Sequence, residues 1–169
     1  MPGKIKDNHQ GLQPDLFGHT PAREKKVPET SAVMYCDGAS SGNPGKAGIG
    51  VVISLSGKDN QTEGPGQYRI SEYIGIATNN VAEYTALVRG LEKAFALGVR
   101  RISIYLDSEL LVRQINGIYK VKNKNLIRYW NRAMQLLKEF AEYKVSHVRR
   151  ELNADADSLA RQGAKNCRA

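Results

Sequence analysis

The sequence contains little cysteine and no long hydrophobic run. Its two cysteines, Cys36 and Cys167, lie far apart among 169 residues, which excludes a disulfide-framed fold and a cysteine-rich zinc site. No segment approaches the roughly 20 apolar residues that a membrane span requires. The first ten residues have no apolar core of the kind that a secretory signal needs. We therefore expect one cytoplasmic domain with no membrane segment and with both cysteines as free thiols.

Acidic side chains are fewer than basic ones. The chain has 25 Lys and Arg residues against 17 Asp and Glu, a net charge of +8. Residues 110–138 contain seven of these lysines and arginines and no acidic residue, and Tyr119, Tyr129 and Trp130 lie between them in the sequence. Such a segment fits a nucleic-acid backbone. It also fits a solvated helix face whose acidic partners come from elsewhere in the fold, and charge alone leaves both interpretations open.

The pattern of polar and apolar residues divides the chain. Residues 1–30 are rich in Pro, Gly, Lys and polar side chains, which predicts a flexible tail before a domain over 31–165 and a C-terminal tail at 166–169. Alternation predicts strands at 32–38, 48–57, within 67–77, at 101–107 and at 143–149. Helical spacing and caps predict helices from Asn80 to Gly98, at 108–117, at 126–143 and, capped by Asn153, at 153–166. This order predicts one α/β sheet with helices packed on it.

Four carboxylates stand at strand ends and helix starts, where the sites of open α/β sheets gather. Asp37 and Asp107 end strands, whereas Glu83 and Asp157 lie in the first turns of helices. If they converge, they form an all-oxygen site suited to Mg²⁺ or Mn²⁺. Each acid also has a local explanation as a turn residue, a helix cap, a capping box with Asn80, or a charge that favours a helix start.

Four segments in this order resemble type 1 ribonuclease H: YCDGASSGNPGKAGIGVVI, ATNNVAEYTALVRGL, IYLDSELLVRQING and HVRRELNADADSLA. The resemblance covers about residues 31–165. It implies a ribonuclease H-like α/β fold with a five-stranded mixed sheet, three antiparallel strands and then two parallel ones, with helices on both faces. It also implies hydrolysis of the RNA strand of RNA–DNA hybrids, in a compact prokaryotic form without the basic protrusion or the hybrid-binding domain of other members.

The resemblance assigns four residues as catalytic metal ligands: Asp37, Glu83, Asp107 and Asp157. They are expected to hold two Mg²⁺ ions, with Mn²⁺ as a substitute, and to give products with a 5′-phosphate and a 3′-hydroxyl. The register of N-x-x-x-D-x-L-A selects Asp157 over Asp155. His147 is the only candidate for the histidine that relatives use in product release. Because it falls in a predicted strand with no glycine around it, we leave it outside the catalytic set.

The resemblance also places five residues near the hybrid: Gly38, Asn43, Asn79, Asn80 and Ser108. Asn and Ser side chains donate and accept hydrogen bonds, as a 2′-hydroxyl does. Turn and cap chemistry is the alternative explanation for the asparagines. Thr78 matches a position that holds a DNA phosphate in relatives. The loop residues Lys120, Lys122 and Lys124 are expected to hold the DNA strand.

Residues 13–17 of the tail, QPDLF, resemble the short peptide by which bacterial replication and repair proteins dock on the sliding clamp. Leu16 and Phe17 would fill an apolar pocket while Gln13 bonds at its edge; the alternative is a tail with two stray hydrophobic residues. The main hypothesis is a monomeric, Mg²⁺-dependent endoribonuclease in DNA replication and genome maintenance. A non-catalytic hybrid-binding or clamp-tethered module on the same fold, and a related nuclease of double-stranded RNA or DNA flaps, remain the alternatives.

Overall fold

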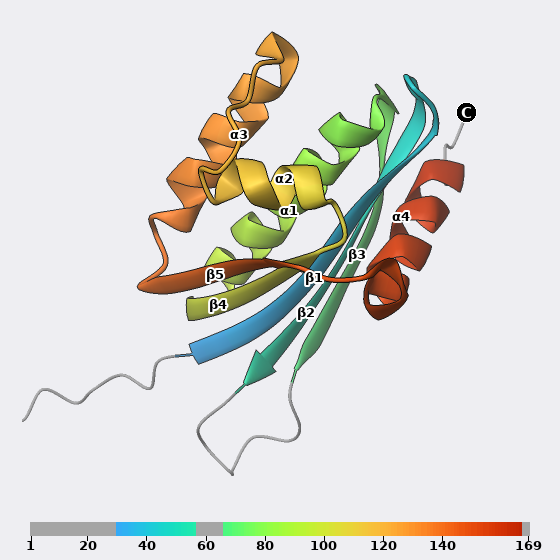
Figure 1. Ribbon diagram of the computed structural model, residues 1–169. Helices are drawn as coiled ribbons and strands as arrows, with labels where there is room; N and C mark the ends of the chain where they lie inside the picture. Colours follow the sequence, from blue (N-terminus) through green and yellow to red (C-terminus); the bar gives the residue numbers. More distant parts are fainter. Residues whose placement is uncertain (1–29, 57–65, 167–169) are drawn as a thin grey trace, which may run out of the picture.

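A five-stranded mixed sheet forms the centre of the computed structural model, which describes residues 30–56 and 66–166 (Figure 1). The strands are β1 (Thr30–Gly42), β2 (Gly45–Ser56), β3 (Gln67–Ala77), β4 (Val99–Leu106) and β5 (Glu142–His147). They are arranged in the order β3-β2-β1-β4-β5. β1 and β3 pair antiparallel with β2, whereas β4 pairs parallel with β1 and β5. The predicted mixed sheet is therefore confirmed.

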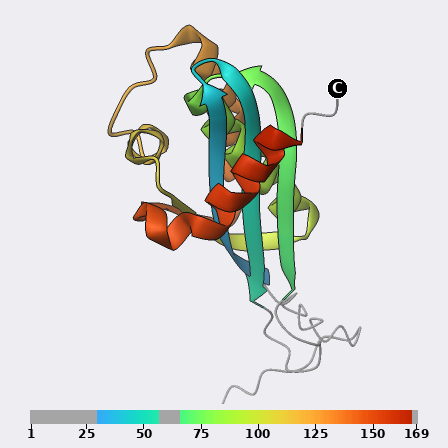
Figure 2. The ribbon, with the colours of Figure 1, turned by 90° about the vertical axis from the view of Figure 1, so that its right-hand side faces the viewer.

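Helices cover both faces of the sheet (Figures 1 and 2). The helices are α1 (Asn79–Ala96), α2 (Glu109–Ile115), α3 (Lys124–Leu137) and, after a 3₁₀ turn η1 (Arg150–Asn153), α4 (Ala154–Lys165). α1, α2 and α3 lie on one face, and α4 packs along β1, β2 and β3 on the other. Among the helices of the described ranges, none combines the length and the apolar character required to cross a membrane.

Strand alternation decides which side chains meet which helix. Met34 is fully buried, and its sulfur lies where a side chain on Gly90 of α1 would go. On the opposite face, a Cβ atom on Gly50 would lie 2.0 Å from the carbonyl oxygen of Ala156 in α4. The missing side chain at Gly50 therefore lets α4 lie directly on β2. Asp37 is the register partner of Gly50, which places Asp37 on the α4 face as well.

Two predicted helix boundaries are wrong. α1 is capped by Thr78, whose hydroxyl accepts from the Val81 N–H at 3.3 Å, and not by Asn80. The capping box of Asn80 therefore does not explain Glu83. The helix predicted over 126–143 ends at 137, because Phe140 turns into the core and the N–H of Ala141 donates to Arg100 at 2.8 Å. That bond leads the chain into β5.

Candidate active site

Two of the predicted acids lie where β1 and β4 separate. The parallel register between the strands ends at Tyr35 and Tyr105, whose ring centroids stack 5.1 Å apart. Asp37 and Asp107 each follow two residues later, so alternation keeps both carboxylates on the face of the stacked tyrosines. The two carboxylates are close enough for the charge of Asp107 to perturb the pKa of Asp37.

Glu83 reaches the same place from α1 because Gly38 has no side chain. A Cβ atom on Gly38 would lie 2.2 Å from the backbone carbon of Ala82 and 2.2 Å from the backbone nitrogen of Glu83. The helix can therefore approach β1 closely enough for Glu83 to lie beside Gly38, the residue that follows Asp37 within β1. Its carboxylate accepts a hydrogen bond from Nδ2 of Asn79 at 2.8 Å.

Asp157 comes from the first turn of α4 and is held by two arginines. Arg150 contacts one carboxylate oxygen at 2.6 Å, and Arg161 contacts the other at 3.0 Å. Partial burial acts to raise the pKa of Asp157, but the two guanidinium groups outweigh it and hold that pKa below its ordinary value. Asp155, the competing acid, instead points away to Arg69 at 3.2 Å and is largely exposed. The structure thus places Asp157, and not Asp155, beside the other acids.

All four acids line one cavity of about 380 Å³. Its lining consists of Asp37, Gly38, Ala39, Ser40, Asn79, Glu83, Asp107, Arg150, Asp157 and Arg161. Side chains from strands and helices far apart in sequence therefore converge here. Their role as metal ligands remains a prediction.

The acids concentrate negative charge in a half-buried space. Burial, together with the charges of Asp107 and Asp157, raises the pKa of Asp37 to about 8. Burial also raises the pKa of Glu83, although a hydrogen bond from Ser108 acts in the opposite direction. A divalent cation would relieve this surplus, and an all-oxygen donor set suits Mg²⁺ or Mn²⁺. Within the described ranges no three His, Cys, Asp or Glu side chains are already gathered as around an ion; Asp157 is turned to its arginines.

The raised pKa of Asp37 predicts a pH-dependent stability in the absence of metal. In the unfolded chain this carboxyl ionises near pH 4, so between about pH 4 and pH 8 the folded protein retains a proton that the unfolded chain has lost. The free energy of unfolding should therefore fall as pH rises through this window, by up to about 1.4 kcal/mol per pH unit. Asp37→Asn should be more stable than the wild type at pH 8 in EDTA, with a gain that disappears near pH 4. Urea unfolding at both pH values measures this, and an equal difference at both would contradict it.

Asn153 belongs to the site in a way that the sequence did not predict. It precedes α4, but its side chain makes no capping bond. The side chain is 1% exposed, and its Nδ2 donates to the carbonyl of Cys36 at 3.2 Å and to Oδ1 of Asp107 at 3.1 Å. Its own Oδ1 is buried without a hydrogen-bond partner among the described residues. Asn153 therefore ties the middle of β1 and the residue after β4 to the start of α4.

Of the residues predicted to contact the hybrid, Gly38 and Asn79 line the acid cavity, and Ser108 hydrogen-bonds to Glu83. The Oδ1 of Asn43, in the β1–β2 turn, accepts from the backbone N–H of Asn79 at 3.4 Å, which joins the turn to the start of α1. Asn80 is exposed, and Ser108 caps α2. Gly38 is buried under α1. β1 and β2 are joined by a tight turn at Asn43 and Pro44, and the contacts with a hybrid remain predictions.

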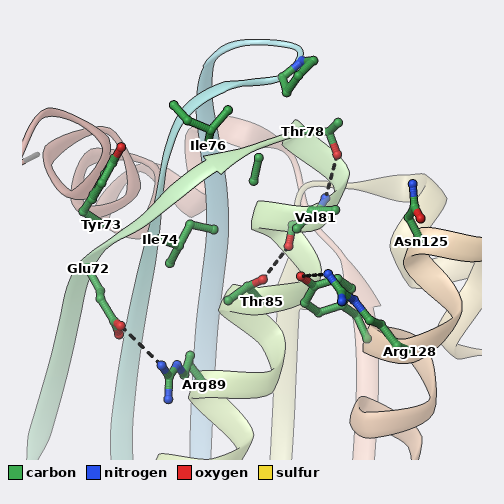
Figure 3. A pocket seen from close by; sticks show the side chains of 13 residues that line it. Glu72, Tyr73, Ile74, Ile76, Thr78, Val81, Thr85, Arg89, Asn125 and Arg128 are labelled. Atoms are coloured by element: carbon green, nitrogen blue, oxygen red, sulfur yellow. Dashed lines mark hydrogen bonds and ion pairs between the residues drawn. The ribbon is translucent and has the colours of Figure 1, made fainter.

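A second cavity, of about 760 Å³, lies next to the N-terminus of α1, between β3 and the start of α3 (Figure 3). Thr78 lines it from the helix start, and Asn125 and Arg128 line it from α3. Arg89 in its wall is paired with Glu72 at 3.4 Å, whereas Arg128 has no acidic partner in the described part of the chain. A hydroxyl, a helix N-terminus and an uncompensated guanidinium together suit a phosphate group.

The seven lysines and arginines of residues 110–138 divide into two groups. Arg113 pairs with Glu109 at 2.6 Å, and Arg132 pairs with Glu92 at 2.8 Å, which fits the solvated-face interpretation. The other five have no acidic partner among residues 30–56 and 66–166: Lys120, Lys122, Lys124, Arg128 and Lys138. These five keep the nucleic-acid interpretation open.

Two sequence predictions concern other parts of the chain. The tail residues Gln13, Leu16 and Phe17 lie outside the described residues, as does Cys167, and the predicted clamp contact remains a prediction. His147 ends β5 and does not line the acid cavity, whereas Arg150 does. Cys36 is a buried free thiol, as expected.

The sequence has relatives among known proteins. A family model described as "Reverse transcriptase-like" matches residues 35–163. Ribonuclease HI of Halobacterium salinarum is 39% identical over 128 residues, which cover 76% of this chain and 61% of that protein. A bifunctional protein of Mycobacterium tuberculosis is also 39% identical over 128 residues, covering 76% of this chain and 34% of its own. The chain therefore spans less than two thirds of the length of these relatives.

Solved structures agree with these sequence matches. Ribonuclease H1 of Halobacterium salinarum aligns with a TM-score of 0.71 and 37% identity, over 81% of this chain and 99% of that one. LC11-RNase H1 in complex with an RNA/DNA hybrid aligns with a TM-score of 0.67 and 36% identity, over 79% of this chain and 96% of that one. The similarity therefore extends across nearly the whole of both solved chains.

Proposed function

Because the chain belongs to the type 1 ribonuclease H family, we propose that it is an endonuclease that hydrolyses the RNA strand of RNA–DNA hybrids. The observation that carries the proposal is the single cavity lined by the four carboxylates of the family motifs. LC11-RNase H1, which shares the fold, was solved with an RNA/DNA hybrid bound. The lysines and arginines around α3 that have no acidic partner supply the positive charge that a nucleic acid requires.

The acid cavity holds the catalytic cations in this proposal. Its ligands are Asp37, Glu83, Asp107 and Asp157. When bound there, two Mg²⁺ ions, or Mn²⁺ in their place, would activate a water for attack on the RNA phosphate and would stabilise charge on the departing 3′ oxygen. The products carry a 5′-phosphate and a 3′-hydroxyl.

Neighbouring side chains support these carboxylates. Asn153 fixes the orientation of Asp107 through its Nδ2 bond, and the bond from Asn79 does the same for Glu83. Arg150 and Arg161 place positive charge at the cavity wall, beside the position that the RNA phosphate occupies. No serine or cysteine nucleophile is required.

The rim residues distinguish the two strands of the hybrid. Asn43, Asn79, Asn80 and Ser108 are the donors and acceptors for the 2′-hydroxyls of the RNA strand. A phosphate of the DNA strand binds in the second cavity at Thr78 and Arg128. The exposed lysines 120, 122 and 124 bind further along that strand, and the tail peptide 13–17 tethers the enzyme to the sliding clamp.

The proposal is tested with one sequence prepared as an RNA–DNA hybrid, a DNA duplex and an RNA duplex, each incubated with the protein in Mg²⁺ and in Mn²⁺. Only the RNA strand of the hybrid should be cut, with 5′-phosphate ends. Cutting of the RNA duplex would keep the chemistry but overturn the substrate. Binding of the hybrid without cutting in either metal would instead establish a non-catalytic hybrid-binding module.

A further inference from the structure

A third cavity, of about 470 Å³, adjoins the acid cavity and is basic. Its lining consists of Ala39, Ser40, Ser41, Lys46, Arg161, Ala164 and Lys165. Three of these side chains are cationic and none is acidic. Ala39, Ser40 and Arg161 line the acid cavity too, so the two cavities share one wall.

The fold brings these cations together from two elements. Lys46 stands in β2 opposite Ser41 of β1, next to the tight turn. α4 packs along β2, and its last two turns carry Arg161 and Lys165 onto the same hairpin. The basic cavity therefore lies between the hairpin and the C-terminal half of α4.

The positive charge of the basic cavity is only partly neutralised. Arg161 is paired with Asp157 at 3.0 Å, but Lys46 and Lys165 have no acidic partner among the described residues. Lys165 lies in the last turn of α4, where the helix dipole also favours a cation. Lys46 is in a strand and has no such local role. Two uncompensated ammonium groups are suited to a phosphate anion. The hydroxyls of Ser40 and Ser41 donate to backbone carbonyls, so the lysines supply the donors for that anion.

We propose that the basic cavity binds a phosphate of the RNA strand next to the phosphate that is cut. This inference rests on the proposed function. The second cavity, which Thr78 lines, neighbours the acid cavity at the next residue, Asn79. The basic cavity instead shares Ser40 and Arg161 with the acid cavity. A strand whose scissile phosphate lies among the acids passes directly to the basic cavity. The lysines of the basic cavity offset the repulsion between the four carboxylates and the phosphates of the RNA strand.

The test is the double variant Lys46→Gln/Lys165→Gln, with Arg100→Gln/Lys144→Gln as a control of equal charge change at exposed positions outside the acid, second and basic cavities. Hybrid binding is measured in EDTA as a function of salt, and cleavage is measured in Mg²⁺. The first variant should raise KM by about tenfold, leave kcat within about twofold, and flatten the salt dependence of binding by one to two phosphate contacts, each worth about 0.9 in the log–log slope. The control should behave as the wild type.

Shortened substrates identify the strand. The difference between the wild type and the double variant should disappear when the RNA strand is shortened on one side of the cut, and not when it is shortened on the other side. The difference should persist when the DNA strand is shortened. Loss of the difference on shortening the DNA strand, or a double variant that matches the control, would overturn the inference. If the wild type binds the hybrid but does not cut it, the proposed function fails, and the salt dependence in EDTA still decides whether the basic cavity binds a phosphate.

Discussion

Replacing Asp157 with asparagine is expected to reduce the rate of RNA-strand cleavage on the order of 10³-fold, because removing a charged ligand forfeits several kcal/mol of transition-state stabilisation. The carboxylate is at the wall of the acid cavity, with two arginines within 3.0 Å. Asparagine keeps the size of the side chain but not its charge. Circular dichroism should show an unchanged fold, and single-turnover cleavage of a labelled hybrid measures the loss.

The chain offers a matched control two residues earlier. Asp155 is on the same helix, but it pairs with Arg69 at 3.2 Å at an exposed position and does not line the cavity. Exposed ion pairs contribute little, so Asp155→Asn should cleave within about twofold of the wild type. A large loss in Asp155→Asn together with full activity in Asp157→Asn would reverse the assignment of the fourth ligand.

Gly50→Ala is expected to destabilise the fold by about 3 kcal/mol, the upper end of the roughly 1–3 kcal/mol that overpacking typically costs, because the new atom meets backbone atoms of α4. The new methyl group would lie 2.0 Å from the carbonyl oxygen of Ala156 and 2.5 Å from the backbone nitrogen of Ala160. α4 would have to move away from β2 and would carry Asp157 with it. Thermal unfolding should show a fall in Tm of about 6–12 °C for a chain of this size, and cleavage should fall at temperatures where the variant is still folded.

Gly66→Ala provides the comparison for Gly50→Ala. A Cβ atom at Gly66 would make ordinary contacts, with the nearest atom, in the Tyr68 ring, at 3.6 Å. Its Tm should therefore stay within about 2 °C of the wild type. Equal Tm values for Gly50→Ala and the wild type would contradict the close packing of α4 on β2.

Most of the fold follows from local sequence patterns. Period-two alternation in 101–107 and helical spacing up to Gly98 each located an element to within a few residues, because side-chain burial sets these periods. The ends of elements were less predictable. α3 stops at Leu137 because Phe140 enters the core and Ala141 bonds to Arg100. Those contacts are long-range, and no pattern within the helix contains them.

The active site likewise combines features that are visible in the sequence with features that only the fold reveals. The position of Asp107 just after its strand is visible in the sequence. Asp37 was predicted to end a strand, but β1 continues to Gly42 because it stays paired with β2. The resemblance to ribonuclease H was needed to join both acids to Glu83. Asn153 was predicted only as a helix cap, whereas it bonds to Asp107 across 46 positions. Arg150 was not singled out at all, because one more arginine in a basic chain carries no signal until the fold places it against Asp157.

The central claim is that the acid cavity cuts the RNA strand of a hybrid with the help of divalent cations. The most direct measurement is cleavage of a hybrid labelled on the RNA strand, by the wild type and by Asp107→Asn, in Mg²⁺ and in EDTA. Cutting by the wild type in Mg²⁺, with loss of cutting in EDTA and in Asp107→Asn while hybrid binding persists, is the predicted result. Cutting that survives either EDTA or the substitution would contradict the assignment of this cavity as the catalytic centre.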